Sequence, residues 1–283
     1  MSYIPAFDCF SGYGRPDFGL VAASGIRAMW HQCGQGNEPG HDDRLFLSNT
    51  EAAAANGIAV GAYFFPFPLP EGRYPNGTRI LGRSPEEQVE RFATLSLFLG
   101  SKVGELSPMI DAEWPAPIDW ARWGCTAPQI SEWLRVFAEL VHQQWGRLPL
   151  IYTYPDFWRH LISGGADVSW ASRYRLWAAA YTHLGPGVPR DTEHPPVLAP
   201  WGDNWDVWQY SAQGSSERIP GVSVPVVDRD CIRDEETFRV LRGMPRHDPD
   251  AITQPVEVPT VRPPTMQAAG YSNLDYDPDA EVA

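Results

Sequence analysis

Residues 106–114 read Leu-Ser-Pro-Met-Ile-Asp-Ala-Glu-Trp, a short apolar run that ends in two acidic residues. A run of this length and composition predicts a buried β-strand. The segment before it predicts a helix over Ser84 to Leu99, because a capping serine is followed by a proline, Glu87 completes a capping box and Gly100 ends the pattern. The segment after it, Ala127 to Trp145, repeats apolar side chains at helical spacing. Helix, strand and helix in succession indicate an α/β fold.

Eight runs of this strand type occur along the chain, and helical patterns also cover Ser48 to Asn56 and Glu235 to Leu241. The predicted strands are Tyr3 to Asp8, Gly25 to His31, Ile58 to Phe65, Leu106 to Glu113, Leu148 to Tyr154, Arg175 to Tyr181, Trp205 to Tyr210 and Ser223 to Asp230. Segments between the first five strands can hold helices, whereas Thr182 to Asn204 and Ser211 to Val222 contain Pro, Gly and polar residues. We therefore predict an irregular TIM-like barrel with five βα units, followed by three strands with loop connections.

The composition changes at about Arg246, where Pro, Asp and small residues replace large apolar side chains. We predict a barrel domain over residues 1–245 and an acidic, Pro-rich, extended tail over residues 246–283. The tail carries two basic and seven acidic residues, a net charge of about −5. A solvated tail is the favoured interpretation. The alternative is that Gly270 to Tyr276, which contains two tyrosines and a leucine, docks on a partner.

Charge and hydropathy exclude several classes of partner. The net charge of −13 argues against nucleic acid, because binding to a phosphate backbone depends on clustered Lys and Arg. Every apolar run ends well before the roughly 20 residues that cross a bilayer, so we predict no membrane span. Residues 1–5 have neither the basic start nor the apolar stretch of a secretory signal peptide. We expect the chain to be mature as given or to leave the cytoplasm by another route.

The cysteines, at positions 9, 33, 125 and 231, lie far apart and include no C-x-x-C pair. This spacing fits neither a zinc ribbon nor a dense disulfide scaffold, and buried free thiols are the default interpretation. A bridge between Cys9 and Cys231 is the alternative if the first and last strands pair. His31, Cys33 and His41 stand near two aspartates, but their irregular spacing favours ordinary polar residues, and we predict no metal and no cofactor.

The two acids that end the quoted strand, Asp111 and Glu113, point to the same face because side chains alternate along a strand. Barrel enzymes carry their catalytic groups at such strand ends. Asp8 closes the first predicted strand, and Asp228 and Asp230 close the last, which is its neighbour in a closed barrel. Carboxyl groups this close cannot all ionise freely, so one is expected to have a raised pKa. Cleavage of a glycosidic bond needs such an acid to protonate the leaving oxygen.

Aromatic residues stand at the same strand ends and predict a groove for a glycan, because sugar rings present apolar faces edged with hydroxyls. The candidate substrate-binding residues are Tyr63, Phe65, Tyr152, Tyr154, Trp177, Tyr181, Trp208 and Tyr210. Core packing is the alternative for any one of them, and for Trp177 in particular.

The strand-end segments resemble those of the family 25 lysozymes, in the same order along the chain. They are Asp8, Gly61 to Phe65, Met109 to Glu113, Pro149 to Tyr154, Leu176 to Tyr181, Trp208 to Ser211 and Val227 to Asp230. The resemblance covers roughly residues 3–241. It implies an irregular barrel with N-acetylmuramidase activity, which hydrolyses the β-1,4 bond between N-acetylmuramic acid and N-acetylglucosamine in peptidoglycan. Such enzymes include secreted lysozymes and phage endolysins, which stay in the host cytoplasm until release or travel with the virion.

The resemblance also implies roles for the acids. Glu113 is similar to the general acid, and Asp111 to its partner, which steers the substrate's acetamido group or stabilises the cationic transition state. Asp8 and Asp228 resemble the flanking acids. The i, i+2 spacing of the central pair is compatible with a retaining or an inverting outcome, and the resemblance favours retention assisted by the acetamido group.

Two segments depart from the family pattern. Cys9 and Phe10 replace the usual Ser after the first acid, and Arg27 to His31 differ from the usual second strand. The resemblance therefore does not assign the residues of the sugar subsites. One alternative function is a structural or glycan-binding protein of a virion or cell wall that retains the barrel, although binding alone does not need Asp111 and Glu113 together. A second alternative keeps the enzyme and changes the substrate to a chitin-like glycan.

Overall fold

The computed structural model describes residues 3–36, 42–68, 72–73, 79–80, 84–113, 125–183, 187–212, 218–225 and 227–245. Contacts within the chain divide it into two units, Met1–His247 and Asp248–Ala283, and the second lies outside the described residues. The docking hypothesis for Gly270 to Tyr276 and the position of His41 also lie outside them. Within the ranges given above, every helix is too short or too polar to cross a bilayer.

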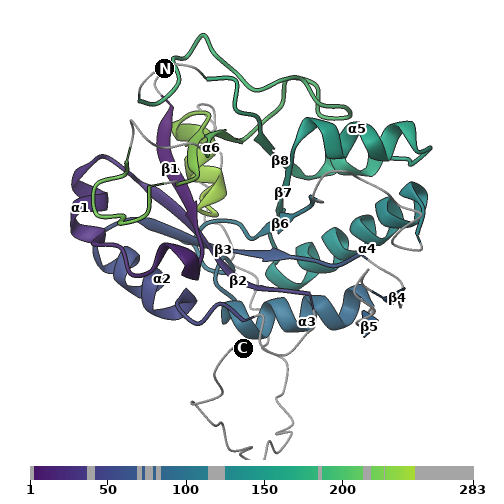
Figure 1. The fold of residues 1–283 in the computed structure, drawn as a ribbon, viewed down its shortest axis with the longest axis horizontal. Coiled ribbons are helices and arrows are strands. Elements are labelled where there is room, and N and C mark those ends of the chain that lie inside the picture. The colour runs from purple at the N-terminus through teal and green to yellow at the C-terminus, as the bar shows by residue number, and fades with distance from the viewer. Residues whose placement is uncertain are drawn as a thin grey trace, which may run out of the picture. The chain divides into compact units, whose positions relative to one another are not determined.

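Eight strands close into a barrel in the order β1-β10-β9-β8-β7-β6-β3-β2. They are β1 Ile4–Cys9, β2 Ala28–Gln35, β3 Ala59–Phe65, β6 Met109–Asp111, β7 Leu150–Thr153, β8 Arg175–Ala179, β9 Val207–Ser211 and β10 Arg229–Ile232. Figure 1 labels six of them, β1, β2, β3, β6, β7 and β8, with helices around them. A helix follows each of the first five barrel strands, whereas the described parts of the β8–β9 and β9–β10 connections contain none. The predicted irregular TIM-like barrel, with five βα units and then three strands, is confirmed.

The helices around the barrel follow the sequence signals closely. They are α1 Phe18–Ala23, α2 Phe46–Ala55, α3 Pro85–Ser96, α4 Ala127–Trp145, α5 Pro155–Ser163 and α6 Glu235–Leu241, with 3-10 helices η1 Ser11–Tyr13 and η3 Ser169–Arg173. The Ser84 hydroxyl accepts from the Glu87 N–H, and the Glu87 carboxylate accepts from the Ser84 N–H, so the predicted capping box begins α3. This helix ends before Gly100, because Leu97 already adopts a left-handed conformation with φ 50°. Two short strands, β4 Gly72–Arg73 and β5 Arg79–Ile80, pair separately from the barrel.

Strand β10 runs antiparallel to both of its neighbours, while the other neighbouring pairs of the barrel are parallel. The prediction of a strand over Ser223 to Asp230 is wrong in its bounds, since β10 begins only at Arg229. Pro225 has no N–H for a strand ladder, and the chain must reach the barrel mouth before it can return in the opposite direction. Asp228 therefore lies at the start of β10, at the end of the barrel where the parallel strands finish.

All four cysteines are buried free thiols, as predicted. The first and last strands do pair, but Cys231 lies opposite Pro5, four residues before Cys9. Four residues of a strand span about 13 Å, which is too far for a disulfide. A bridge between Cys9 and Cys231 is therefore excluded.

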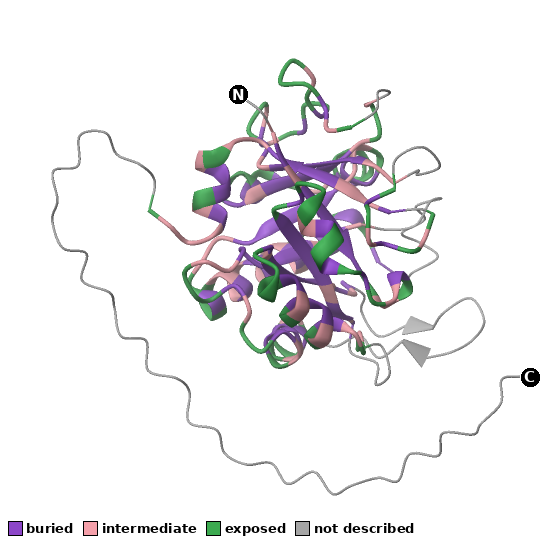
Figure 2. Ribbon diagram, turned by 90° about the vertical axis from the view of Figure 1, so that its left-hand side faces the viewer, coloured by how far each residue is buried: buried purple, intermediate pink, exposed green. Residues whose placement is uncertain are grey.

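Side chains fill the barrel on both sides of its wall. Inside it, the Trp30 and Trp177 rings pack edge to face with centroids 4.7 Å apart. Gly61 makes room for this pair, since a Cβ there would lie 2.6 Å from the Trp30 ring. Outside it, the helices bury a larger apolar layer, and the exposed residues lie on their outer faces (Figure 2). The interior is therefore a packed core and not a pore.

Candidate active site

A cleft of about 330 Å³ opens at the ends of the parallel strands. Asp8 from β1, Asp111 and Glu113 from the end of β6, and Asp228 from the start of β10 converge in it. The other lining residues are Phe10, Gln32, Tyr63, Met109, Tyr152, Tyr181 and Gln209. The structure thus brings together all four acids that the sequence indicates as candidate catalytic residues.

Asp111 and Glu113 are positioned by the pairing of β6 with β7. Asp111 lies opposite Tyr152, and the Ala112 N–H donates to the Tyr152 carbonyl at 2.9 Å. Burial and, after it, the charges of Glu113 and Asp8 raise the pKa of Asp111 well above its usual range. The Asp111 Oδ1 atom is buried and has no hydrogen-bond partner in the described part of the chain. A buried acceptor of this kind is suited to a donor from a ligand.

Glu113 is less buried than Asp111 and has the pKa of a proton donor. Burial together with the Asp228 charge raises the pKa of its carboxyl to about 7. A carboxyl with this pKa holds its proton in a large fraction of molecules near neutral pH and can still release it. These are the properties of a general acid.

Gln209 fixes the orientation of Asp8. Its amide N–H donates to Asp8 Oδ2 at 2.7 Å, and its carbonyl oxygen accepts from the Tyr152 and Tyr181 hydroxyls at 3.0 and 2.9 Å. The two hydroxyl donors determine which side of the amide faces Asp8. Burial and then the Asp228 charge raise the pKa of Asp8 well above its usual range, and the Gln209 hydrogen bond opposes that shift.

Tyr13, from η1, holds Asp228 in the cleft. Its hydroxyl donates to Asp228 Oδ2 at 2.6 Å and accepts from the Asp228 N–H at 3.1 Å. Burial raises the pKa of Asp228, and this hydrogen bond lowers it. Burial and the charges of Asp8 and Asp228 raise the pKa of the Tyr13 hydroxyl, so it stays a donor. The Phe10 ring, 40% exposed at the cleft, packs on Tyr13 with centroids 5.0 Å apart.

Three of the eight aromatic residues predicted to bind substrate line the cleft: Tyr63, Tyr152 and Tyr181. Tyr181 is 52% exposed and is the most accessible of them. The other five do not line it in the described structure: Phe65, Tyr154, Trp177, Trp208 and Tyr210.

Strand geometry explains where these five residues lie. Trp208 and Tyr210 flank Gln209 on β9, so they face outward when Gln209 faces the cleft. Trp177 packs in the core inside the barrel, which is the alternative interpretation given for it above. Phe65 packs on Phe67 with centroids 5.3 Å apart, and Tyr154 packs on Phe157 at the start of α5. Trp177, Trp208 and Tyr210 are therefore core residues, whereas substrate binding by the partly exposed Phe65 and Tyr154 stays a prediction.

The site also contains residues that the sequence patterns do not predict: Gln209, Tyr13, Phe10, Gln32 and Met109. Strand alternation carries a signal for Gln209, because it stands between two large apolar residues that face outward. Tyr13 and Phe10 lie in the connection after β1, where no periodicity indicates the direction of a side chain.

His31 and Cys33 face away from the cleft. The Asn49 amide donates to His31 Nε2 at 3.0 Å, and His31 Nδ1 lies 2.7 Å from the Gln32 carbonyl, which fits a neutral ring donating from Nδ1. Burial lowers the pKa of His31, which agrees with this neutral state. The Cys33 thiol donates to the Tyr63 carbonyl at 3.2 Å. In the part of the chain that the structure describes, no three His, Cys, Asp or Glu side chains are placed to hold a metal ion.

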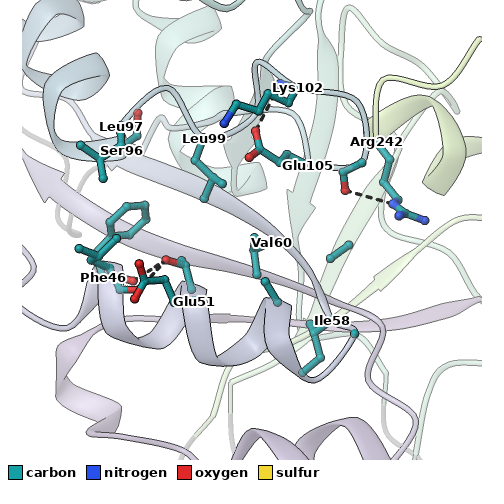
Figure 3. Close-up of a pocket in the computed structure, with 16 residues that line it drawn as sticks. Phe46, Glu51, Ile58, Val60, Ser96, Leu97, Leu99, Lys102, Glu105 and Arg242 are labelled. Atoms are coloured by element: carbon teal, nitrogen blue, oxygen red, sulfur yellow. Dashed lines mark hydrogen bonds between the residues drawn. The ribbon is translucent and has the colours of Figure 1, made fainter.

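A second groove, of about 530 Å³, lies between α2 and the loop after α3, beside the start of β3 (Figure 3). Two of its charged side chains, Glu105 and Arg242, bind the loop backbone. The Glu105 carboxylate accepts from the N–H groups of Gly100 and Lys102 at 2.8 and 3.3 Å. The Arg242 guanidinium donates to the Gly104 carbonyl at 3.2 Å. These charges stabilise the fold and leave no cluster of acids in the groove.

Comparisons with known proteins agree with this geometry. The model of the glycosyl hydrolases family 25 matches residues 7–221. A family GH25 lysozyme from Aspergillus fumigatus has a similar structure, with 20% identity and a TM-score of 0.64, and the match covers 85% of this chain and 99% of that chain. The bacterial lysozyme from Streptomyces coelicolor gives 24% identity, a TM-score of 0.64 and coverage of 85% and 96%. The CTP1L endolysin gives 15% identity, a TM-score of 0.55 and coverage of 86% and 70%. No curated protein sequence matches the chain.

The family match covers more than half of the 283 residues and includes Asp8, Asp111 and Glu113, while Asp228 lies beyond its end. The likeness to solved structures shows that the fold is shared. The family model, the barrel and the acids at its mouth lead to one assignment: this chain belongs to glycosyl hydrolase family 25 and is a glycosidase.

Proposed function

We propose that this chain is a lysozyme of the muramidase type, which hydrolyses the β-1,4 bond between N-acetylmuramic acid and N-acetylglucosamine in peptidoglycan and so lyses bacterial walls. Membership of family 25 supports a glycosidase, and two of the structurally similar proteins are lysozymes. The observation that carries the proposal is the pair at the end of β6. Glu113 has a pKa of about 7, and Asp111 beside it presents a buried oxygen without a partner among the described residues.

The pair supports a reaction in which each acid has its own task. Glu113 donates its proton to the glycosidic oxygen as the bond breaks, because a neutral carboxyl is the group able to do so. Asp111 accepts a hydrogen bond from the N–H of the substrate's acetamido group at its free Oδ1 atom. The acetamido oxygen then attacks the anomeric carbon, and Glu113, now ionised, takes a proton from the water that completes hydrolysis with retention.

Asp8 and Asp228 line the same cleft and support the same reaction. The sugar ring becomes cationic in the transition state, and carboxylates stabilise it only where they are already oriented. Gln209 orients Asp8, and Tyr13 orients Asp228. We propose both acids as electrostatic residues of the active site.

The cleft also suits a glycan strand in its apolar contacts. Phe10 and Tyr181 are 40% and 52% exposed, and both line the cleft beside the acids. Ring faces at such positions pack on the apolar faces of sugars. The net charge of −13 gives no electrostatic attraction to an anionic wall, so affinity must come from these contacts and from hydrogen bonds in the cleft.

The test is digestion of purified peptidoglycan, followed by turbidity and by mass spectrometry of the released fragments. We expect clearing of the suspension and fragments with N-acetylmuramic acid at the reducing end. Fragments with N-acetylglucosamine at the reducing end would contradict the bond assignment. Cleavage of chitin oligomers but not of peptidoglycan would favour a chitin-like substrate. Binding without cleavage would favour a structural or glycan-binding protein.

A further inference from the structure

A fifth carboxyl group, Asp230, lies directly below the cleft but does not line it. It is 0% exposed, and the register of β10 places it between Ala6 of β1 and Gln209 of β9. The ion pairs found among the described residues do not include it, and the charges that act on it are those of Asp8 and Asp228, which are negative. A buried carboxyl without a cation is normally neutral.

The hydrogen bonds around Asp230 require a proton. The Trp177 indole N–H donates to Asp230 Oδ1 at 3.2 Å, and Asp230 Oδ2 is buried with no partner that could donate to it. The carboxyl groups of Asp8 and Asp230 are also hydrogen-bonded to each other. Two ionised carboxylates have only acceptors, so this bond exists only if one of the two is protonated.

The surroundings assign that proton to Asp230. Asp8 Oδ2 already accepts the Gln209 N–H, whose direction is fixed by two tyrosine hydroxyls, and Asp8 has access to the cleft. Donated hydrogen bonds and access to solvent favour the ionised form of a carboxyl. Among the described residues Asp230 has one donor, the Trp177 indole, and no access to solvent, which favours the protonated form.

We propose that Asp230 is a positioning residue of this glycosidase, a neutral carboxylic acid that donates a hydrogen bond to the Asp8 carboxyl and orients Asp8 toward the cleft. The titratable groups that face it are Asp8, Asp228 and Tyr181, and Cys231 is its neighbour along β10. Burial and the charges of Asp8 and Asp228 raise the pKa of Asp230 well above its usual range, which agrees with a neutral acid. Its role in catalysis rests on the proposed function, whereas its protonation does not.

The test uses two variants of the full chain. Asp230→Asn keeps an N–H donor toward Asp8 and needs no proton, whereas Asp230→Ala removes the donor. We expect Asp230→Asn to keep a kcat near that of the wild type. Asp230→Ala should lose roughly 10- to 100-fold in kcat with little change in KM, the range for a lost hydrogen bond to a charged group. Circular dichroism and thermal unfolding check that both variants fold.

An infrared difference spectrum tests the proton without any substrate. At neutral pH the wild type minus Asp230→Asn spectrum should contain the C=O stretch of a carboxylic acid. Loss of a carboxylate stretch in its place would overturn the proposal, as would a folded Asp230→Asn variant as impaired as Asp230→Ala. Absence of peptidoglycan hydrolysis by the wild type would contradict the muramidase proposal alone, because the infrared result is independent of the substrate.

Discussion

Two grooves of the barrel unit, the cleft at its mouth and the groove beside α2, differ in what their charged side chains do. Beside the start of β3, Glu105 and Arg242 bind backbone groups of one loop, so their charges are used by the fold. At the mouth, the pKa values of Asp8, Asp111 and Glu113 are raised by burial and by neighbouring carboxylates, and Asp111 Oδ1 has no partner among the described residues. The mouth cleft is the smaller of the two, about 330 Å³ against 530 Å³. The volume of a groove therefore does not identify the active site. Buried carboxyl groups that do not stabilise the fold identify it.

This contrast has an energetic side. In the groove between α2 and the loop after α3, called the loop groove here, hydrogen bonds to charged groups add to the stability of the folded chain. Like charges buried at the mouth subtract from it, and proteins retain such arrangements where function requires them. Substitution of acids in the two places should therefore have opposite effects on stability and activity.

The largest effect is expected for Glu113→Gln, which keeps the shape of the side chain and removes the proton donor. Loss of general acid catalysis costs roughly 10²–10⁴-fold in rate, so kcat on peptidoglycan should fall by at least that range. Asp111→Asn should also be severe, because it loses a negative charge beside the transition state. Turnover is measured by release of reducing ends, with folding checked by circular dichroism. Near-normal turnover by a folded Glu113→Gln variant would overturn the mechanism.

The same variant should gain stability, and the gain should depend on pH. Glu113 has a folded pKa of about 7 against a usual value of 4.5, so the folded state binds its proton more tightly than the unfolded state does. Stability is therefore lost as the pH rises from about 4.5 through 7, and Gln avoids the loss. The gain should be near zero at pH 4 and approach about 3 kcal/mol above pH 7, since one pKa unit corresponds to about 1.4 kcal/mol.

Thermal or urea unfolding of the two proteins at pH 4 and pH 8 measures this gain. Glu51→Gln is the control, because Glu51 is an exposed acid that lines the loop groove. It should change stability little at either pH. An equal gain for Glu113→Gln at both pH values would show that its carboxyl is not perturbed.

At the other groove, Glu105→Ala should destabilise the protein without affecting catalysis. The variant leaves the N–H groups of Gly100 and Lys102 without their carboxylate acceptor, which costs about 1–3 kcal/mol. The free energy of unfolding in urea and the kcat of the folded enzyme are the two measurements. A fall in kcat as large as the fall for Asp111→Asn would mean that the two ends of the barrel are coupled.

Tyr13→Phe should have a smaller effect, on activity. It removes the hydroxyl that donates to Asp228 and accepts from its N–H, and loss of one hydrogen bond to a charged group corresponds to roughly tenfold in kcat. Tyr174→Phe is the matched control, because the Tyr174 hydroxyl also donates to a carboxylate, that of Glu139 at 3.0 Å, away from the cleft. Equal effects of the two substitutions on kcat would exclude a specific role for Tyr13.

Most of the barrel is predictable from sequence because its elements have local signals. The helix α4 occupies Ala127–Trp145, the range predicted from its apolar spacing, and the capping box fixes the start of α3. The bounds of the last strand are not predictable in this way, because the alternation of side chains does not indicate the direction of a strand. Strand β10 is antiparallel to its neighbours and begins after Asp228, not before it. Asp228 therefore lies at the barrel mouth because β10 begins there, and not because the strand ends there.

The acids of the site are predictable for the same reason as the strands, since each stands next to a strand end. Their partners are not. Gln209 and Asp8 are 201 positions apart in sequence, and Tyr13 and Asp228 are 215 apart. Such contacts depend on the closure and register of the whole barrel, which no local pattern contains. The proposed proton on Asp230 also depends on barrel closure, because the Asp8 and Trp177 side chains that surround Asp230 come from other strands.

The smallest effect is expected from removal of residues 246–283. Apolar packing of the described chain ends with α6, where Phe238 and Leu241 are buried, and every described cleft residue comes before them. The truncated protein should unfold within roughly 0.5 kcal/mol of the full chain, as for changes away from the core, and should hydrolyse soluble glycan fragments at the same rate. Loss of folding would show that the tail packs on the barrel. A rate that falls only on intact cell walls would instead support docking of Gly270 to Tyr276 on a wall component, because the soluble substrate does not need it.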